Sequence, residues 1–342
     1  MLNFIGNRYK ILNCSSEIEL DKIYKATDAY NNEKVLIKIV EHNDNICEDF
    51  ISSLIDECTM LRDIDSPHIL KIIDVGIHHT EYTTLYYIVS EYSSGISLDS
   101  IIRGNYIHLE ALINMATQIL KSLEIAKSYS LYHGNLKPSN IIVDKNYNVK
   151  IFDFAVTKAN NGINIRSCGE VKYLSPHQLC INYTDTESDF FSLGLILFEA
   201  IFKKLPFGEC YNEDEMLKLI DKGVNWNELK AINGNEELIR IIKKLLNRTN
   251  KYENTQDIII DLSSVMYEKA DIDEDIAIEN NNIELKDKKS NKVGLIVAGA
   301  VLTSFIITLF LRCFSIILFF KIFFALAKVE QSKTTKKSSL ST

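Results

Sequence analysis

The sequence predicts an α+β fold in which a small β-rich part precedes a larger helical part. Two runs of strand length, 35–40 (VLIKIV) and 86–92 (YYIVSEY), consist mainly of β-branched and aromatic residues. Between them, apolar residues recur at helical spacing over 48–63. From 108 to about 265 the apolar spacing is largely helical, interrupted by short strands at IIVD and VKIFDF. The chain therefore divides into two lobes near residue 92.

Composition and charge exclude several classes of protein. Of the 342 residues, 46% are hydrophobic and 25% are charged, which is enough apolar material for a sizeable core. The formal net charge of -8 argues against a nucleic-acid partner, because nucleic-acid binding requires a basic surface. The seven cysteines are scattered without CxxC spacing, which fits a reducing compartment better than a disulfide framework.

The C-terminal part of the chain has a different composition. Residues 266–292 are polar and have no sustained apolar face, which is typical of a linker. The next nineteen residues, 293–311, carry no charge and are long enough to cross a hydrocarbon core of about 30 Å as a helix. We therefore expect a transmembrane helix there. The N-terminus has no apolar run for secretion, so we expect the preceding domain to be cytoplasmic at the cell membrane.

A second apolar segment and a lysine-rich tail occupy 312–342. Residues 314–327 are apolar except for Lys321, and lysines flank the whole apolar region on both sides. Positive residues favour the cytoplasmic side, so the flanks agree with a hairpin of two spans. No glycine or proline between 300 and 328 marks a turn, however, and we favour a single crossing with the hairpin as the alternative.

Two neighbouring motifs point to a family. The segments HGNLKPSNIIVD (133–144) and IFDFAVTK (151–158) resemble the catalytic loop and the magnesium loop of Hanks-type Ser/Thr protein kinases, whose patterns are H-R-D-L-K-P-x-N and D-F-G. Around them, VLIK, DECTMLRDIDSPHIL, GEVKYLSPHQL and SDFFSLGLILFEAIFKKLPF follow in family order. The resemblance covers about residues 9–265 and implies a two-lobed protein kinase-like fold, with an N-lobe over about 9–92 and a C-lobe over about 93–265.

The resemblance implies roles for individual residues. Phosphoryl transfer needs a lysine on the phosphates, magnesium held by carboxylate and amide oxygens, and a base near the attacking hydroxyl. The lysine position is Lys38, which can pair with Glu57. The metal-ligand positions are Asn140 and Asp153, if a nucleotide binds, and Lys137 would then face the γ-phosphate.

The base position is changed. Where the family has its catalytic aspartate, this sequence has Asn135, and an amide cannot take a proton at neutral pH. General-base action contributes roughly 10²–10⁴ in rate, so this change alone is severe. The neighbouring arginine is Gly134, and Glu170 replaces a threonine of the activation segment. We expect Glu170 either to pair with Lys137 or to be solvated.

The nucleotide site is also altered. Glycines let the backbone approach phosphate closely, and the resemblance places three other residues where they belong, namely Ser16, Ile18 and Asp21. Leu36 replaces the alanine that roofs the adenine, and we expect it to complete an apolar stack with Ile23 and Ile142. No cofactor is therefore expected. Mg-ATP binding after a slight shift of the strands is the alternative.

One ion pair of the family is lost in this sequence, whereas the residues of the regulatory stack are retained. The family's A-P-E glutamate is His177, and its arginine partner falls near Lys251, so an ion pair is lost at both ends. The positions of the regulatory stack that links the two lobes keep suitable residues, namely Leu61, Ile72, His133, Phe154 and Asp189.

These losses predict a degenerate kinase. We expect a membrane-anchored pseudokinase, similar in domain order to bacterial membrane kinases, that acts as a signalling scaffold or allosteric partner of another protein, such as an active kinase or a membrane complex. The alternatives are an active Ser/Thr kinase with atypical catalytic residues and a nucleotide-sensing domain without transfer. Gly294 and Ala298 form a small-xxx-small pair, which leaves a homodimer open.

Overall fold

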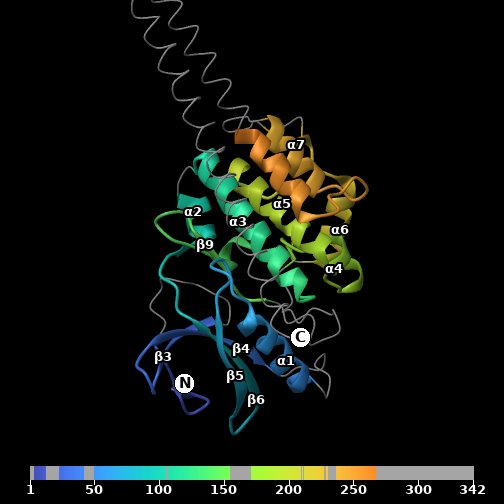
Figure 1. Cartoon of the computed structure of the whole chain (residues 1–342). Coiled ribbons are helices and arrows are strands. Elements are labelled where there is room, and N and C mark those ends of the chain that lie inside the picture. Colours follow the sequence, from blue (N-terminus) through green and yellow to red (C-terminus); the bar gives the residue numbers. More distant parts are fainter. Residues whose placement is uncertain are drawn as a thin grey trace, which may run out of the picture. The chain divides into compact units, whose positions relative to one another are not determined.

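Six strands form the antiparallel sheet of the N-terminal lobe (Figure 1). The computed structural model describes residues 4–12, 23–41, 50–104, 107–154, 171–208, 210, 212–226, 229 and 236–266. The strand order is β1-β2-β3-β4-β6-β5. The strands, in that order, are Phe4–Ile5, Tyr9–Ile11, Ile23–Asp28, Lys34–Glu41, Thr84–Glu91 and Ile72–His79, and helix α1 spans Phe50–Asp63 and packs against β5.

The alternation of strand β4 explains how the sheet presents its two faces. Val35, Ile37 and Ile39 point into one apolar cluster together with the buried Tyr9. The intervening residues point to the opposite face, because successive side chains of a strand alternate. Leu36 enters a second cluster on that face, and Lys38 follows it. The sheet therefore buries one face and turns Leu36 and Lys38 toward the other lobe.

The C-terminal lobe is mainly helical (Figure 1). A small antiparallel sheet of order β7-β8-β9 carries the loops of the site. Its strands are Ile96–Ser97, Ile141–Val143 and Val149–Ile151. The helices are α2 (Leu98–Gly104), α3 (Leu109–Ser128), α4 (Pro176–Ile181), α5 (Thr186–Phe202), α6 (Glu213–Lys222), α7 (Glu236–Leu245) and one over 255–266, with a 3-10 turn η1 at Pro138–Asn140.

Helix α5 is the central helix of this lobe, and the structure shows how each of its ends is capped. Asp185 begins it with a capping box, in which its carboxylate accepts from the backbone N–H of Ser188 at 2.9 Å. The helix ends at Lys203, whose left-handed conformation stops the helical hydrogen bonding. Gly194 allows close packing, since a Cβ at that position would lie 2.8 Å from Leu245 Cβ.

The fold matches the expected α+β architecture. Strands β4 and β6 and helix α1 lie where the apolar spacing predicts them, and β8 and β9 coincide with the two short strands predicted in the helical half. Within the described ranges, every helix is too short or too polar to span a membrane. The predicted span 293–311 and most of the predicted linker lie outside those ranges.

Candidate active site

Asp153 is the centre of a polar cluster between the two lobes. Its side chain is only 8% exposed, and its backbone has φ of +64°. One carboxylate oxygen, Oδ1, pairs with Lys38 Nζ at 2.6 Å. The other, Oδ2, accepts from the side-chain amides of Asn135 at 2.8 Å and Asn140 at 3.3 Å. The cluster therefore brings together four of the residues predicted for the site.

Local structure holds each member of this cluster in place. Lys38 extends from the central strand β4 and also donates to the backbone oxygen of Phe154 at 3.0 Å. Turn η1 places Asn140, whose amide donates to the backbone oxygen of Asn135 at 2.8 Å. The two asparagines are thus bonded both to each other and to Asp153, which fixes the loop relative to strand β9.

The arrangement leaves little for a metal ion to bind. Mg²⁺ takes oxygen ligands in near-octahedral geometry. Both oxygens of Asp153 already have partners, and Asn135 and Asn140 turn their amide nitrogens, not their oxygens, toward it. The residue types suit a hard cation, but their arrangement here does not fit one.

The expected pairing of Lys38 with Glu57 stays a prediction. Glu57 is 1% exposed on helix α1, and the ion pair that the structure describes for Lys38 is with Asp153. Lys38 Nζ contacts both the carboxylate of Asp153 and the carbonyl oxygen of Phe154. Burial and the nearby Glu57 raise the pKa of the Cys58 thiol to about 12, so this thiol stays protonated.

The expected apolar stack around Leu36 is confirmed. Leu36 is 3% exposed and clusters with Ile142 and Phe152, while Ile23 packs against them. A cavity of about 40 Å³ remains beside the cluster, lined in part by Lys38. Asp153 lines it as well, so the cavity lies between the apolar cluster and the polar cluster around Asp153.

The regulatory stack also assembles. The rings of His133 and Phe154 stack with centroids 4.6 Å apart, and Leu61 and Ile72 are buried in the same apolar cluster as Phe154. The stack joins helix α1 and strand β5 of one lobe to the catalytic loop of the other. The packing positions are therefore occupied as the sequence predicts.

Asp189 of helix α5 anchors the loop that carries this stack. Its carboxylate accepts from the backbone N–H groups of His133 and Gly134, each at 2.8 Å. Burial raises the pKa of Asp189 to about 7, although both N–H donors act in the opposite direction. Burial lowers the pKa of His133 to about 4. Gly134 has φ of +70°, a conformation that glycine adopts without strain.

Comparisons with known proteins agree with this geometry. The family model for the protein kinase domain matches residues 19–260. The chain belongs to the Hanks-type protein kinase family. A probable serine/threonine-protein kinase of Clostridium acetobutylicum is 31% identical over 84% of this chain and 45% of its own length. A similar probable kinase of Clostridium perfringens is 28% identical over 83% of this chain and 41% of its own length. This kinase-family chain thus spans less than half the length of these curated relatives.

A solved structure confirms the fold alone. The crystal structure of Rad53 1-466 in complex with AMP-PNP superposes with a TM-score of 0.59 and 22% identity, covering 74% of this chain and 64% of the other.

A third relative found by sequence is the serine/threonine-protein kinase PrkC of Bacillus subtilis. It is 32% identical over 59% of this chain and 32% of its own length.

Several predicted site residues lie outside the described part of this kinase domain. They are the three residues at the glycine positions and the residue proposed to face Lys137, namely Ser16, Ile18, Asp21 and Glu170. Lys137 itself is described and half-buried, immediately before turn η1. The pairing of Lys137 with Glu170 stays a prediction.

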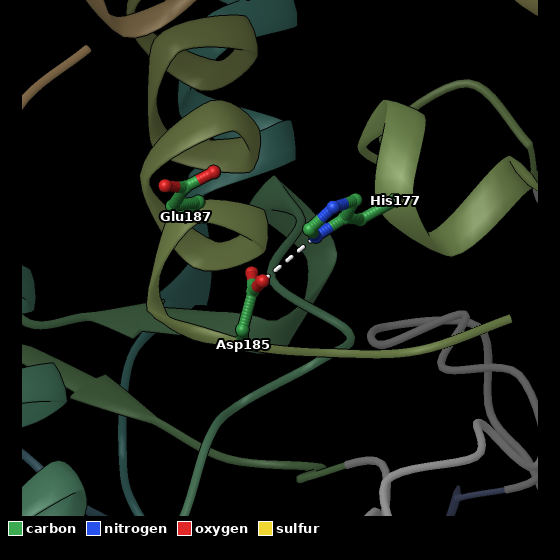
Figure 2. Close-up of side chains that lie close together, drawn as sticks. All are labelled: His177, Asp185 and Glu187. Atoms are coloured by element: carbon green, nitrogen blue, oxygen red, sulfur yellow. Dashed lines mark hydrogen bonds and ion pairs between the residues drawn. The ribbon is translucent and has the colours of Figure 1, made fainter. Parts of the chain in front are cut away.

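His177 and Lys251, the two positions of the lost ion pair of the kinase C-lobe, each have a different partner. His177 Nδ1 lies 2.7 Å from the carboxylate of Asp185, and Lys251 pairs with Glu187 (Figure 2 shows three of these residues). The sequence predicts the loss but not the two new partners. Both acids lie at the start of helix α5, one in the residue before it and one in its first turn.

Two residues of the site are missing from the sequence prediction. Phe152 is 4% exposed and fills space next to Leu36, and Leu70 completes the same cluster. A signal for Phe152 exists, because it is a large apolar residue immediately before Asp153. Leu70 carries no comparable signal, since it lies between two predicted elements.

Proposed function

We propose that this chain is a membrane-anchored pseudokinase that acts as a signalling scaffold or allosteric binding partner, without efficient phosphoryl transfer. The observation that carries the proposal is the hydrogen bond of 2.8 Å from the Asn135 amide to Asp153. The group at the position of the general base is a hydrogen-bond donor engaged within the site. It has no basic atom with which to take a proton from a substrate hydroxyl.

Two further features support the proposal. The carboxylate that would hold the metal is bonded on both oxygens by Lys38, Asn135 and Asn140. Leu36, at the position where the resemblance implies the roof of the adenine site, is buried in an apolar cluster with Ile142 and Phe152. Base, metal and nucleotide are all needed for transfer, so each of these features would act against it.

The packing that links the lobes supports a binding role. Asp189, His133 and Phe154 form a continuous connection from helix α5 to the small lobe. A domain that keeps its interlobe connection can present a defined surface to a partner even when it does not transfer phosphate. The partner proposed from the kinase likeness is another protein, either an active kinase or a membrane complex.

The membrane part of the proposal depends on the charge-free residues 293–311. Their length suits a single crossing, which would keep the kinase domain at the cytoplasmic face of the cell membrane. Tethering raises the local concentration of the domain near other membrane proteins, so weak contacts with a partner become effective.

An active Ser/Thr kinase is the second candidate. It is favoured by the cluster of Lys38, Asn140 and Asp153, since these three residues would hold phosphates and metal in an active enzyme. The bacterial relatives are named serine/threonine-protein kinases, which also agrees with it. A nucleotide sensor without transfer would use the same three residues.

One experiment separates these candidates. The purified full chain is incubated with radiolabelled Mg-ATP and a generic protein substrate, beside a Lys38→Ala variant. We expect no transfer above the Lys38→Ala background, and no recovery in Asn135→Asp. Transfer that disappears in Lys38→Ala would refute the proposal. Thermal unfolding with Mg-ATP in the same samples distinguishes a nucleotide sensor, which would be stabilised, from a scaffold, which would not.

A further inference from the structure

The C-lobe contains a second cavity, and no residue of the Asp153 cluster lines it. Its volume is about 140 Å³, more than three times that of the cavity beside Leu36. It lies between the start of α4, the first turns of α5 and the segment after α7. An apolar cavity of about 150 Å³ holds a benzene ring in another protein. This cavity therefore has room for one small aromatic ring.

The floor of the cavity is aromatic and apolar. Phe190, Phe191, Leu245 and Tyr252 all line it, and each of them is at most 5% exposed. Their positions are fixed, since the first two belong to helix α5 and the hydroxyl of Tyr252 donates to Asp261 at 2.6 Å. A rigid apolar floor is typical of small-molecule sites, in which a few polar groups then set orientation.

Three basic side chains lie at the rim of the cavity. His177, Arg248 and Lys251 line it, with Glu187 as the one acidic lining residue among those described. Each base has an acidic partner: His177 has Asp185, Arg248 has Asp221 and Lys251 has Glu187.

These ion pairs can exchange partners at low cost. The side chains of Arg248 and Asp221 are 48% and 53% exposed, and those of Lys251 and Glu187 are 36% and 46% exposed. Exposed pairs of this kind contribute little to stability. A ligand carboxylate can therefore take the place of one of these acids.

We propose that this cavity binds a small aromatic carboxylate, with its ring on the apolar floor and its carboxylate on Arg248 and Lys251. Charge and shape lead to the same ligand class. A neutral ring would make no charge-assisted contact with Arg248 or Lys251, and an acid without a ring would leave the apolar floor in contact with water. The site is separate from the Asp153 cluster, so it does not depend on whether the domain transfers phosphate.

A metal ion is the other ligand that these residues suggest. His177, Asp185 and Glu187 offer ligand atoms within 4.8 Å of one another (Figure 2). Two of these groups are bonded to each other, and Glu187 is paired with Lys251, whose positive charge would repel a cation. The geometry therefore favours the anion, and Zn²⁺ serves as a competing probe in the test.

The test uses ligand-observed NMR titrations of the full chain in detergent, with benzoate as the probe. We expect saturable benzoate binding, with benzylamine and acetate each binding at least tenfold more weakly. Benzylamine keeps the ring and reverses the charge, whereas acetate keeps the charge and lacks the ring. Equal binding of benzylamine, or the absence of saturable benzoate binding, would overturn the proposal.

Variants locate the site. Arg248→Gln and Lys251→Gln should each weaken benzoate binding about tenfold, which is the effect of losing one charge-assisted contact. Lys204→Gln is the matched control, because Lys204 is exposed in the same lobe and does not line the cavity. Equal weakening in Lys204→Gln would contradict the assignment. Thermal stabilisation of the protein by Zn²⁺ would also contradict the assignment, if His177→Ala abolishes that stabilisation and benzoate does not reduce it.

Discussion

Asn135 donates its side-chain amide to Asp153 across 2.8 Å, in a kinase-family site where the resemblance places two carboxylates. Two carboxylates that close would repel each other unless a cation lay between them. With the amide, the contact is attractive and needs no metal. With asparagine at position 135, the site is therefore stabilised without an ion.

This contact predicts that Asn135→Asp makes the stability of the domain depend on magnesium. Without divalent ions, the new carboxylate should lower the free energy of unfolding by about 1–3 kcal/mol, because a partly buried hydrogen bond is lost and a like charge is added. Mg²⁺ alone should restore most of the loss. Thermal unfolding of the full chain in chelator and in Mg²⁺ measures both effects. Asn135→Ala is the control, since it loses the bond without gaining a charge, and an identical Mg²⁺ response in both variants would contradict the prediction.

The cluster around Leu36 predicts a packing cost. Leu36→Ala should lower the free energy of unfolding by about 2–5 kcal/mol, because Leu36 is 3% exposed against Ile142 and Phe152. Leu36→Met keeps the volume and should cost less than about 1.5 kcal/mol. Urea unfolding compares the two variants. If Leu36→Ala costs no more than Leu36→Met, the cluster is not tightly packed and the site is open to a nucleotide.

The sequence predicts the packing of this domain better than its polar contacts. The alternation in strand β4 is enough to place Leu36 and Lys38 on the same face, and the motif order is enough to place Asp153 near them. The ion pair of Lys38 with Asp153 could not be predicted in this way, because it depends on the left-handed backbone of Asp153, with φ of +64°, which no residue spacing reveals. Side-chain amides add a second difficulty, since an asparagine can present either its oxygen or its nitrogen to a neighbour.

The C-lobe illustrates the same limit. The sequence shows that His177 and Lys251 cannot form the family's ion pair, but it does not show which acids replace the lost partners. Asp185 and Glu187 become the partners because capping of helix α5 places both of them near its first turn. A contact of this kind depends on where a helix begins, which sequence spacing fixes only to within a few residues.

Buried His133 predicts a pH effect with a definite sign. Its pKa is lowered from 6.5 to about 4, so the unfolded chain takes up a proton at this residue between those values while the folded chain does not. Stability attributable to His133 therefore falls as pH drops from about 6.5 toward 4, by roughly 1.4 kcal/mol per pH unit at most. His133→Phe keeps a ring for the stack and removes the titration.

The measurement is the difference between the unfolding free energies of the unaltered protein and His133→Phe over that pH range. Other groups, including Asp189 with its raised pKa, contribute to both proteins and largely cancel in the difference. On acidification, the free energy of unfolding of the unaltered protein should fall more than that of His133→Phe. A flat difference would show that His133 is accessible to protons in the folded state.

The predicted membrane segment leads to a prediction about topology. One crossing at 293–311 places position 340 outside the cell, whereas a hairpin returns it to the cytoplasm. In a Cys313→Ser background, Leu340→Cys should react with a membrane-impermeant thiol reagent in intact cells. Lys286→Cys, on the other flank, is the matched control and should react only after lysis. Protection of both cysteines until lysis would contradict the single crossing and favour the hairpin, in which Lys321 lies within the second span at a cost of about 2.5–3.5 kcal/mol.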